Sequence, residues 1–155
     1  MKQHTYKVKM EWTGNLGEGT SNYKAYSRDH LISAPAKQIQ IPGSSDPTFR
    51  GDNTRYNPEE LLVSTISSCH MLWYLHLCTT AGITVISYVD HASGTMEEQS
   101  NGSGHFTQVI LEPIITIENA ETKHQIAKEL HIKAHEMCFI ANSLNFDILV
   151  KPIIK

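Results

Sequence analysis

The chain has 155 residues, enough for one domain over 1–155 with a sizeable core. Apolar residues make up 40% and charged residues 19%, a mixture that excludes an intrinsically disordered chain. The net charge is −3 and no Lys/Arg run occurs, so we expect neither nucleic-acid nor membrane binding. Three cysteines are too few for a secreted disulfide framework, and the first residues do not resemble a signal peptide. We therefore expect a cytoplasmic protein.

The first third of the chain contains short segments in which apolar and polar residues alternate. This alternation predicts strands over 6–12 and 38–42, and the apolar pieces at 23–27 and 31–33 are candidate strands between them. A long loop follows over 43–57. A loop of this length is usually functional, but it is also compatible with a plain solvated connection, and the sequence leaves both interpretations open.

A strong helix start follows the loop. Asn57 suits the N-cap, and Pro58 suits the first helical position. The helix is predicted to continue to about Thr80 and to stop at Gly82. Its apolar residues surround most of the axis, but Ser, Thr and His interrupt them. We therefore predict a helix buried inside a larger structure and not a membrane span.

The second half of the chain combines strands with one more helix. Strands are predicted over 83–90, 94–97, 105–111 and 114–117, with a hairpin turn at 100–104. Helical spacing of apolar residues predicts a helix over 121–141, and a closing strand is expected over 146–154. Strands grouped around two helices indicate an α+β fold.

The cysteines are the first candidates for chemistry. Cys69 and Cys138 fall on the two predicted helices, where each is either a small apolar core residue or a member of a redox pair formed when the helices pack together. Cys78 lies nine residues after Cys69 on the same helix, roughly 13 Å along its axis. A disulfide needs Cα atoms about 5.5 Å apart, so Cys78 cannot pair with Cys69 and is interpreted as a core residue.

A reactive thiol needs a cation nearby, because the thiolate is the nucleophile. Cys69 lies about three turns into its helix, where the dipole offers little, and the chain has only three arginines, at 28, 50 and 55. Each is either a surface charge or a candidate partner of the thiolate. Glu59 lies roughly 15 Å before Cys69 on the same helix. An antiparallel copy of this helix from a second subunit would bring Glu59 beside the partner's thiol, which suggests a shared two-fold site.

A metal site is the competing interpretation of the same region. Cys69, His70, His135 and Cys138 contain the ligand types of a zinc site, but their spacing matches no common zinc pattern. Adjacent helical residues also point about 100° apart, which makes Cys69 and His70 poor joint ligands. The other interpretation of both histidines is packing with a backbone hydrogen bond. We expect neither a metal nor a cofactor.

Two segments around the thiols resemble a known family. Residues 57–70 are Asn-Pro-Glu-Glu-Leu-Leu-Val-Ser-Thr-Ile-Ser-Ser-Cys-His, and residues 134–143 are Ala-His-Glu-Met-Cys-Phe-Ile-Ala-Asn-Ser. Both resemble the OsmC/Ohr family of osmotically inducible and organic-hydroperoxide-resistance proteins, and the similarity covers nearly the whole chain. His70 and Met71 after Cys69 are more similar to the OsmC-like branch. The resemblance implies an intertwined α+β homodimer with antiparallel sheets and two long central helices.

The resemblance also implies site residues. Cys69 is similar to the family's peroxidatic cysteine, Cys138 to its resolving cysteine, and Glu59 to the acid that pairs with an arginine at the peroxide site. Arg50 fits the arginine's place in the OsmC-like order and Arg28 fits it in the Ohr-like order; we favour Arg50.

The activity implied by this resemblance is a peroxiredoxin-like thiol peroxidase that reduces organic hydroperoxides in oxidative and osmotic stress defence. Cys69 would form a sulfenic acid and then a disulfide with Cys138, and an external dithiol, of the lipoyl type by the resemblance, would restore both thiols. The alternative function is a non-enzymatic OsmC-like stress-response or small-ligand-binding protein with inert cysteines.

Overall fold

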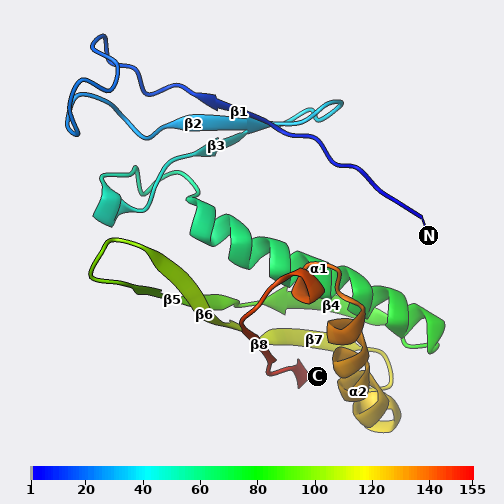
Figure 1. Ribbon diagram of the computed structural model, residues 1–155. Helices are drawn as coiled ribbons and strands as arrows, with labels where there is room; N and C mark the ends of the chain where they lie inside the picture. Colours follow the sequence, from blue (N-terminus) through cyan, green and yellow to red (C-terminus); the bar gives the residue numbers. More distant parts are fainter. Residues whose placement is uncertain (1) are drawn as a thin grey trace. The chain divides into compact units, whose positions relative to one another are not determined.

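The computed structural model describes residues 2–155 and divides the chain into two compact units, of which the first ends at Leu61 and the second is Leu62–Lys155. Both contain antiparallel strands, and two long helices accompany them (Figure 1). The predicted α+β class is therefore confirmed, whereas the single-domain organisation stays a prediction.

The first unit is built on a three-stranded antiparallel sheet in the order β1-β2-β3. Its elements are β1 (Lys9–Trp12), β2 (His30–Ser33), β3 (Ile41–Gly43) and a short 3-10 helix η1 (Pro47–Phe49). Three of the four predicted strands exist. The predicted strand over 23–27 is wrong, because Arg28 donates to the carbonyl oxygens of Tyr23 and Tyr26 and so occupies acceptors that a strand would need for its ladder.

Helix α1, Pro58–Thr80, begins in the first unit and continues through the second. Its start is the predicted cap: Glu60 N–H donates to Asn57 Oδ1 at 2.8 Å, and Asn57 N–H donates to Glu60 Oε2 at 3.1 Å. Gly82 follows its end with φ of 68°, a conformation that glycine adopts without strain. Both predicted helix ends are confirmed.

One face of α1 is buried at a spacing of four residues. Ile66, His70, Tyr74 and Cys78 form this stripe. The other faces are largely uncovered: only 22% of the most apolar 18-residue window is buried, and the helix is long and apolar enough to cross a membrane by length and composition. An apolar helix surface of this size normally packs against another surface.

Two mixed sheets form the rest of the second unit, in the orders β4-β7-β9 and β5-β6-β8. The strands are β4 (Val85–Asp90), β5 (Ser93–Glu98), β6 (Gly104–Leu111), β7 (Pro113–Ile117), β8 (Asp147–Val150) and β9 (Ile153–Ile154). The β4–β7 and β5–β6 pairs are antiparallel, whereas β8 and β9 join β6 and β7 in parallel. Parallel pairing is possible here because α2 carries the chain across the unit before β8 begins.

The end of the chain differs from the prediction in two places. Helix α2 is Ala120–Met137 and stops four residues early, because the Asn142 amide donates to the carbonyl oxygen of Glu136 in the last turn. A second 3-10 helix, η2, follows at Ala141–Ser143. The single closing strand is also wrong: Pro152 lacks an N–H group and separates β8 from β9, which belong to different sheets.

Two apolar clusters hold the second unit together. Tyr74 and Cys78 of α1 pack with Ala127 and Ala134 of α2 and with the inner residues of β7 in the first cluster. Ile66 packs with Val109 and Leu111 of β6 in the second cluster. Along the buried stripe of α1, His70 lies between Ile66 and Tyr74 and therefore between the two clusters.

Candidate functional site

The structure brings Cys69 and Cys138 together, although 69 positions separate them in the sequence. Cys69 lies in the middle of α1 and is half-buried, whereas Cys138 directly follows α2 and is buried. Burial first, and then a hydrogen bond with the Cys69 thiol, raises the pKa of Cys138 to about 11. Cys138 is thus a protonated thiol at neutral pH, and the more accessible Cys69 is the candidate nucleophile.

The backbone around Cys138 fixes its sulfur. Cys138 has an extended conformation, with φ of −69° and ψ of 109°, between α2 and η2. Its N–H donates to the His135 carbonyl oxygen at 3.2 Å, and its Sγ accepts a hydrogen bond from the N–H of Ala141 at 3.4 Å. The sequence predicts Cys138 inside a helix, which is wrong; the early end of α2 instead puts this thiol on a turn.

Cys78 is a core residue, as its spacing from Cys69 predicts. It is fully buried in the cluster that joins α1 to α2, and burial raises the pKa of its thiol. A buried thiol without a nearby cation is chemically inert, so the reactive candidates are the other two.

The remaining predicted site residues belong to the first unit. Glu59 is half-buried in the first turn of α1 and forms no ion pair within residues 2–155. Arg28 is held by hydrogen bonds of 2.7 and 2.9 Å to the carbonyl oxygens of Tyr26 and Tyr23, and its guanidinium lies 4.2–4.3 Å from both ring centroids. The guanidinium of Arg28 is therefore already satisfied inside its own unit.

Arg50 differs from Arg28 in having fewer partners. It ends η1 with φ of 65°, a left-handed conformation that is uncommon for a residue other than glycine. Its guanidinium has one recorded contact within the described chain, the Tyr23 ring at 5.9 Å. Arg55, the third arginine, pairs with Asp29 and Asp52 at 3.6 Å. Of the three, Arg50 is best able to take an external anion.

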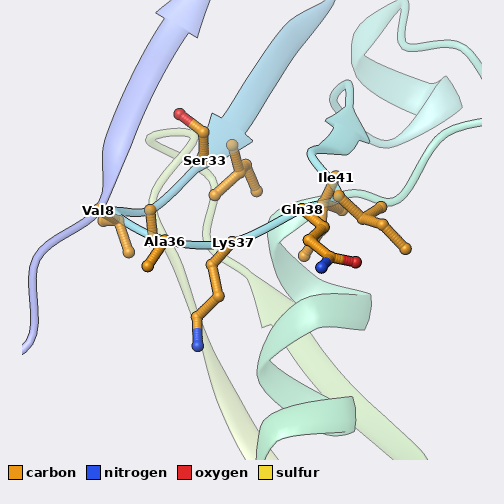
Figure 2. A pocket seen from close by; sticks show the side chains of 9 residues that line it. Val8, Ser33, Ala36, Lys37, Gln38 and Ile41 are labelled. Atoms are coloured by element: carbon orange, nitrogen blue, oxygen red, sulfur yellow. The ribbon is translucent and has the colours of Figure 1, made fainter.

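The described part of the first unit contains a polar and an apolar cavity. Arg28 and Arg50 both line a polar cavity of about 330 Å³. A second pocket, of about 570 Å³, is apolar and is shown in Figure 2. Val8, Ile32 and Ile41 are among its lining residues, and the Lys37 side chain extends beside them. The apolar pocket contains no thiol, so its lining suits contact with an apolar surface and offers no redox chemistry.

A buried histidine pair is the feature that the sequence analysis missed. His70 Nε2 and His131 Nδ1 are 2.9 Å apart, and both side chains are almost fully buried. Of the two interpretations of His70 from the sequence, packing is the one that the structure matches, but the hydrogen-bond partner is an imidazole and not a backbone group. His131 belongs to the same buried face of α2 as Ala127 and Ala134, and this helical spacing was the available signal.

Both imidazoles are neutral at pH 7. Burial, and secondarily the charge of His135, lowers the pKa of His70 to about 4. Burial, followed by the charge of His70, lowers that of His131 to about 3. Tyr74, which stacks on His131, and Tyr88, which lies beside Tyr74, stay neutral because burial raises their pKa values. The pair therefore holds one N–H···N hydrogen bond without a net charge.

These depressed pKa values predict loss of stability in weak acid. The unfolded chain takes up protons on both histidines below about pH 6.5, whereas the folded chain does not until about pH 4 and below. The neutral imidazoles' contribution to the free energy of unfolding is fully present above pH 6.5. It is lost as the pH falls, by up to about 1.4 kcal/mol per pH unit for each imidazole. Urea unfolding between pH 7 and 4.5 measures it.

The matched control is a chain in which both histidines are replaced by amides, His70→Gln with His131→Asn. It should lose markedly less stability between pH 6.5 and 4.5 than the native chain, because it lacks the two titrating groups. Parallel pH curves for the two proteins would contradict neutral imidazoles in the core.

Metal binding receives no support from the side-chain arrangement. Within residues 2–155, no group of three or more His, Cys, Asp or Glu side chains is placed to hold a metal ion. Cys69, His70, His135 and Cys138 thus do not form the zinc site considered from the sequence.

Comparison with known proteins identifies the family. The sequence model described as "OsmC-like protein" matches residues 51–152, which include both thiols and both long helices. The chain belongs to the OsmC-like protein family. No curated protein sequence matches it.

Solved structures show the same OsmC-like fold. An OsmC-like protein of unknown function from Vibrio cholerae has a TM-score of 0.87 and 28% identity, covering 97% of this chain and 100% of its own. An organic hydroperoxide resistance protein from Elizabethkingia anophelis has a TM-score of 0.69 and 19% identity, covering 99% and 97%. The organic hydroperoxide resistance protein OhrB of Bacillus subtilis has a TM-score of 0.62 and 17% identity, covering 98% of each chain. The recognised family and the α+β OsmC-like architecture are confirmed.

Proposed function

We propose that this OsmC-like protein is a thiol peroxidase that reduces organic hydroperoxides to alcohols in stress defence. The observation that carries the proposal is that the Cys69 thiol lies close enough to Cys138 to help raise the pKa of the Cys138 thiol. Two thiols in contact, of unequal burial, are the arrangement that a two-cysteine peroxidase needs. The organic hydroperoxide resistance proteins with the same fold add support.

The chemistry has two steps. The Cys69 thiolate attacks one peroxide oxygen, the O–O bond breaks, and the alcohol leaves with the proton that the thiol lost, so that Cys69 becomes a sulfenic acid. The Cys138 sulfur then attacks the Cys69 sulfur. The S–O bond breaks, the S–S bond forms, and water leaves with the Cys138 proton. An external dithiol, which we propose to be of the lipoyl type, reduces the disulfide by exchange.

Arg50 is the proposed cation for the thiolate, with Glu59 as the acid that orients it. Arg28 is the weaker candidate, because its guanidinium is held by two carbonyl oxygens and two tyrosine rings, whereas the Arg50 guanidinium makes no such hydrogen bond with residues 2–155. A guanidinium beside a thiolate favours the anion and also orients a peroxide.

We propose a homodimer as the active form, in the cytoplasm. Large apolar side chains are exposed in the single chain: Leu72 of α1 is 63% exposed and Ile132 of α2 is 66% exposed. A second copy that covers these faces would explain how α1 can be long and apolar without crossing a membrane. Three unpaired cysteines fit a reducing compartment. A monomer in sedimentation at full activity would exclude the dimer.

The test of the peroxidase is a stoichiometric titration. One equivalent of tert-butyl hydroperoxide is added to the reduced chain carrying Cys78→Ala, which leaves two thiols. We expect both thiols to be lost, one alcohol to form per chain, and Cys69 and Cys138 peptides to be linked in the mass spectrum. Unchanged thiols with intact peroxide would instead favour a non-enzymatic, ligand-binding OsmC-like protein.

A further inference from the structure

The His70–His131 pair has a geometry that ordinary packing does not require. The two ring planes are 11° apart and their centroids 5.2 Å apart, while the facing nitrogens are 2.9 Å apart. The centroid distance exceeds the N···N distance by roughly two ring radii. The rings therefore lie end to end in nearly one plane, joined by a straight N–H···N bond, and not face to face.

Helices α1 and α2, with the residue that directly follows α2, supply both the imidazole pair and the thiol pair. On α1, His70 directly follows Cys69, and the two side chains point about 100° apart. On the other side, His131 lies on α2 and Cys138 directly follows its last residue. Position 138 is seven residues after position 131, which is almost two full helical turns, so both positions lie near one face of α2. Consecutive residues of α1 thus meet partners from one side of α2.

Apolar contacts also hold α2 against α1, but they define its register less sharply than a hydrogen bond does. Ala127 and Ala134 are the other buried residues of α2, and methyl groups allow close approach but define no direction. A hydrogen bond between buried imidazoles forms in only one register, because a shift of α2 along α1 separates the nitrogens.

The cost of the pair argues for such a directional contact. His70 Nδ1 and His131 Nε2, the outer nitrogens, are buried without a hydrogen-bond partner in the described chain. Two apolar side chains of similar volume would fill the same space without leaving polar atoms unpaired. What they would lack is the fixed register.

We propose that His70 and His131 are positioning residues that hold Cys138 against Cys69. This inference rests on the proposed function, because it concerns the step in which the two sulfurs join. That step needs sulfurs within bonding geometry, and small displacements of reacting groups reduce rates and equilibria strongly. The imidazole bond keeps the end of α2 in place, and with it the Cys138 thiol.

The test measures the effective concentration of the two thiols from the equilibrium between the Cys69–Cys138 disulfide and a glutathione redox buffer. All proteins carry Cys78→Ala, so that one disulfide is possible. We expect His131→Leu to lower the effective concentration at least about tenfold. The matched control is His124→Leu, the same change at an exposed position of α2, which should leave it unchanged.

Two amide variants separate the hydrogen bond from packing. The Asn amide ends near the position of Nδ1, the atom with which His131 contacts His70, whereas the Gln amide ends near Nε2. His131→Asn should therefore remain within about threefold of the native value, and His131→Gln should fall with His131→Leu. His131→Gln also replaces His131→Leu if the latter does not fold.

The outcomes distinguish the two proposals. If His131→Leu and His131→Gln both kept the native effective concentration, the positioning role would be overturned and the peroxidase proposal would stand. The same conclusion would follow if His131→Asn and His131→Gln lowered the effective concentration equally. The predicted order without any peroxide turnover in the native chain would support positioning and overturn the peroxidase.

Discussion

Replacing Cys69 by serine is expected to abolish hydroperoxide turnover, lowering kcat/KM by at least about a thousandfold. A hydroxyl at this position is a far weaker nucleophile than a thiolate and cannot form a sulfenic acid. The remaining thiol, Cys138, cannot substitute for it, because burial keeps it protonated at neutral pH. Turnover is measured by coupling disappearance of an organic hydroperoxide to oxidation of a dithiol.

Cys78→Ala is the matched control for this prediction. It removes a thiol from the same helix, nine positions further along, and leaves the proposed chemistry in place. We expect near-native turnover from a somewhat less stable protein, since a small buried side chain is shortened. If Cys78→Ala and Cys69→Ser lost activity to the same extent, the assignment of Cys69 as the nucleophile would be wrong.

Replacing Cys138 by serine is expected to stop the reaction after one turnover. The Cys69 thiolate still cleaves the peroxide, because that step does not use the Cys138 sulfur. The sulfenic acid then persists, since a serine hydroxyl cannot close a disulfide. One equivalent of hydroperoxide should give one equivalent of alcohol per chain and a Cys69 adduct with a dimedone probe, detected by mass spectrometry.

The native chain treated in the same way provides the comparison, and it should give little adduct because the disulfide forms first. Steady-state turnover of Cys138→Ser with a dithiol reductant should fall steeply, while the first turnover keeps its rate. Full steady-state activity would show that Cys138 has no resolving role, and loss of the first turnover would show that it has another one.

Together, these two substitutions test whether the difference in burial between the two thiols assigns the nucleophilic role to one and the resolving role to the other. Cys69 is half-buried, and Cys138 is buried and carries a raised pKa. Accessibility suits the thiol that meets the peroxide, and protonation suits the thiol that waits for the sulfenic acid.

The corrected elements share a cause. The predicted ends of α2 and of the closing strand are wrong because the pairing of backbone groups changes there: the Asn142 amide takes a carbonyl of the last turn of α2, and Pro152, which has no N–H, divides the strand between two sheets. Hydrophobic periodicity reports which face of a segment is buried, but it does not report where its backbone groups find partners.

The sequence by itself determined the local features and the family. The start of α1 is set by the Asn57–Glu60 capping box and its end by Gly82, because both depend on residues within one turn of the helix. The α+β class follows from periodicity, and the residues around Cys69 and Cys138 already resemble OsmC-like proteins.

Only the tertiary structure decided which distant groups meet. The His70–His131 bond joins α1 to α2, and the Cys69–Cys138 contact joins α1 to the turn that follows α2, each across more than sixty residues. No local rule fixes the crossing of two helices. That crossing depends on the packing of alanines against α1 and on a hydrogen bond between imidazoles that neither helix could satisfy alone. The chemistry proposed for this protein therefore depends on a contact between side chains that only folding brings together.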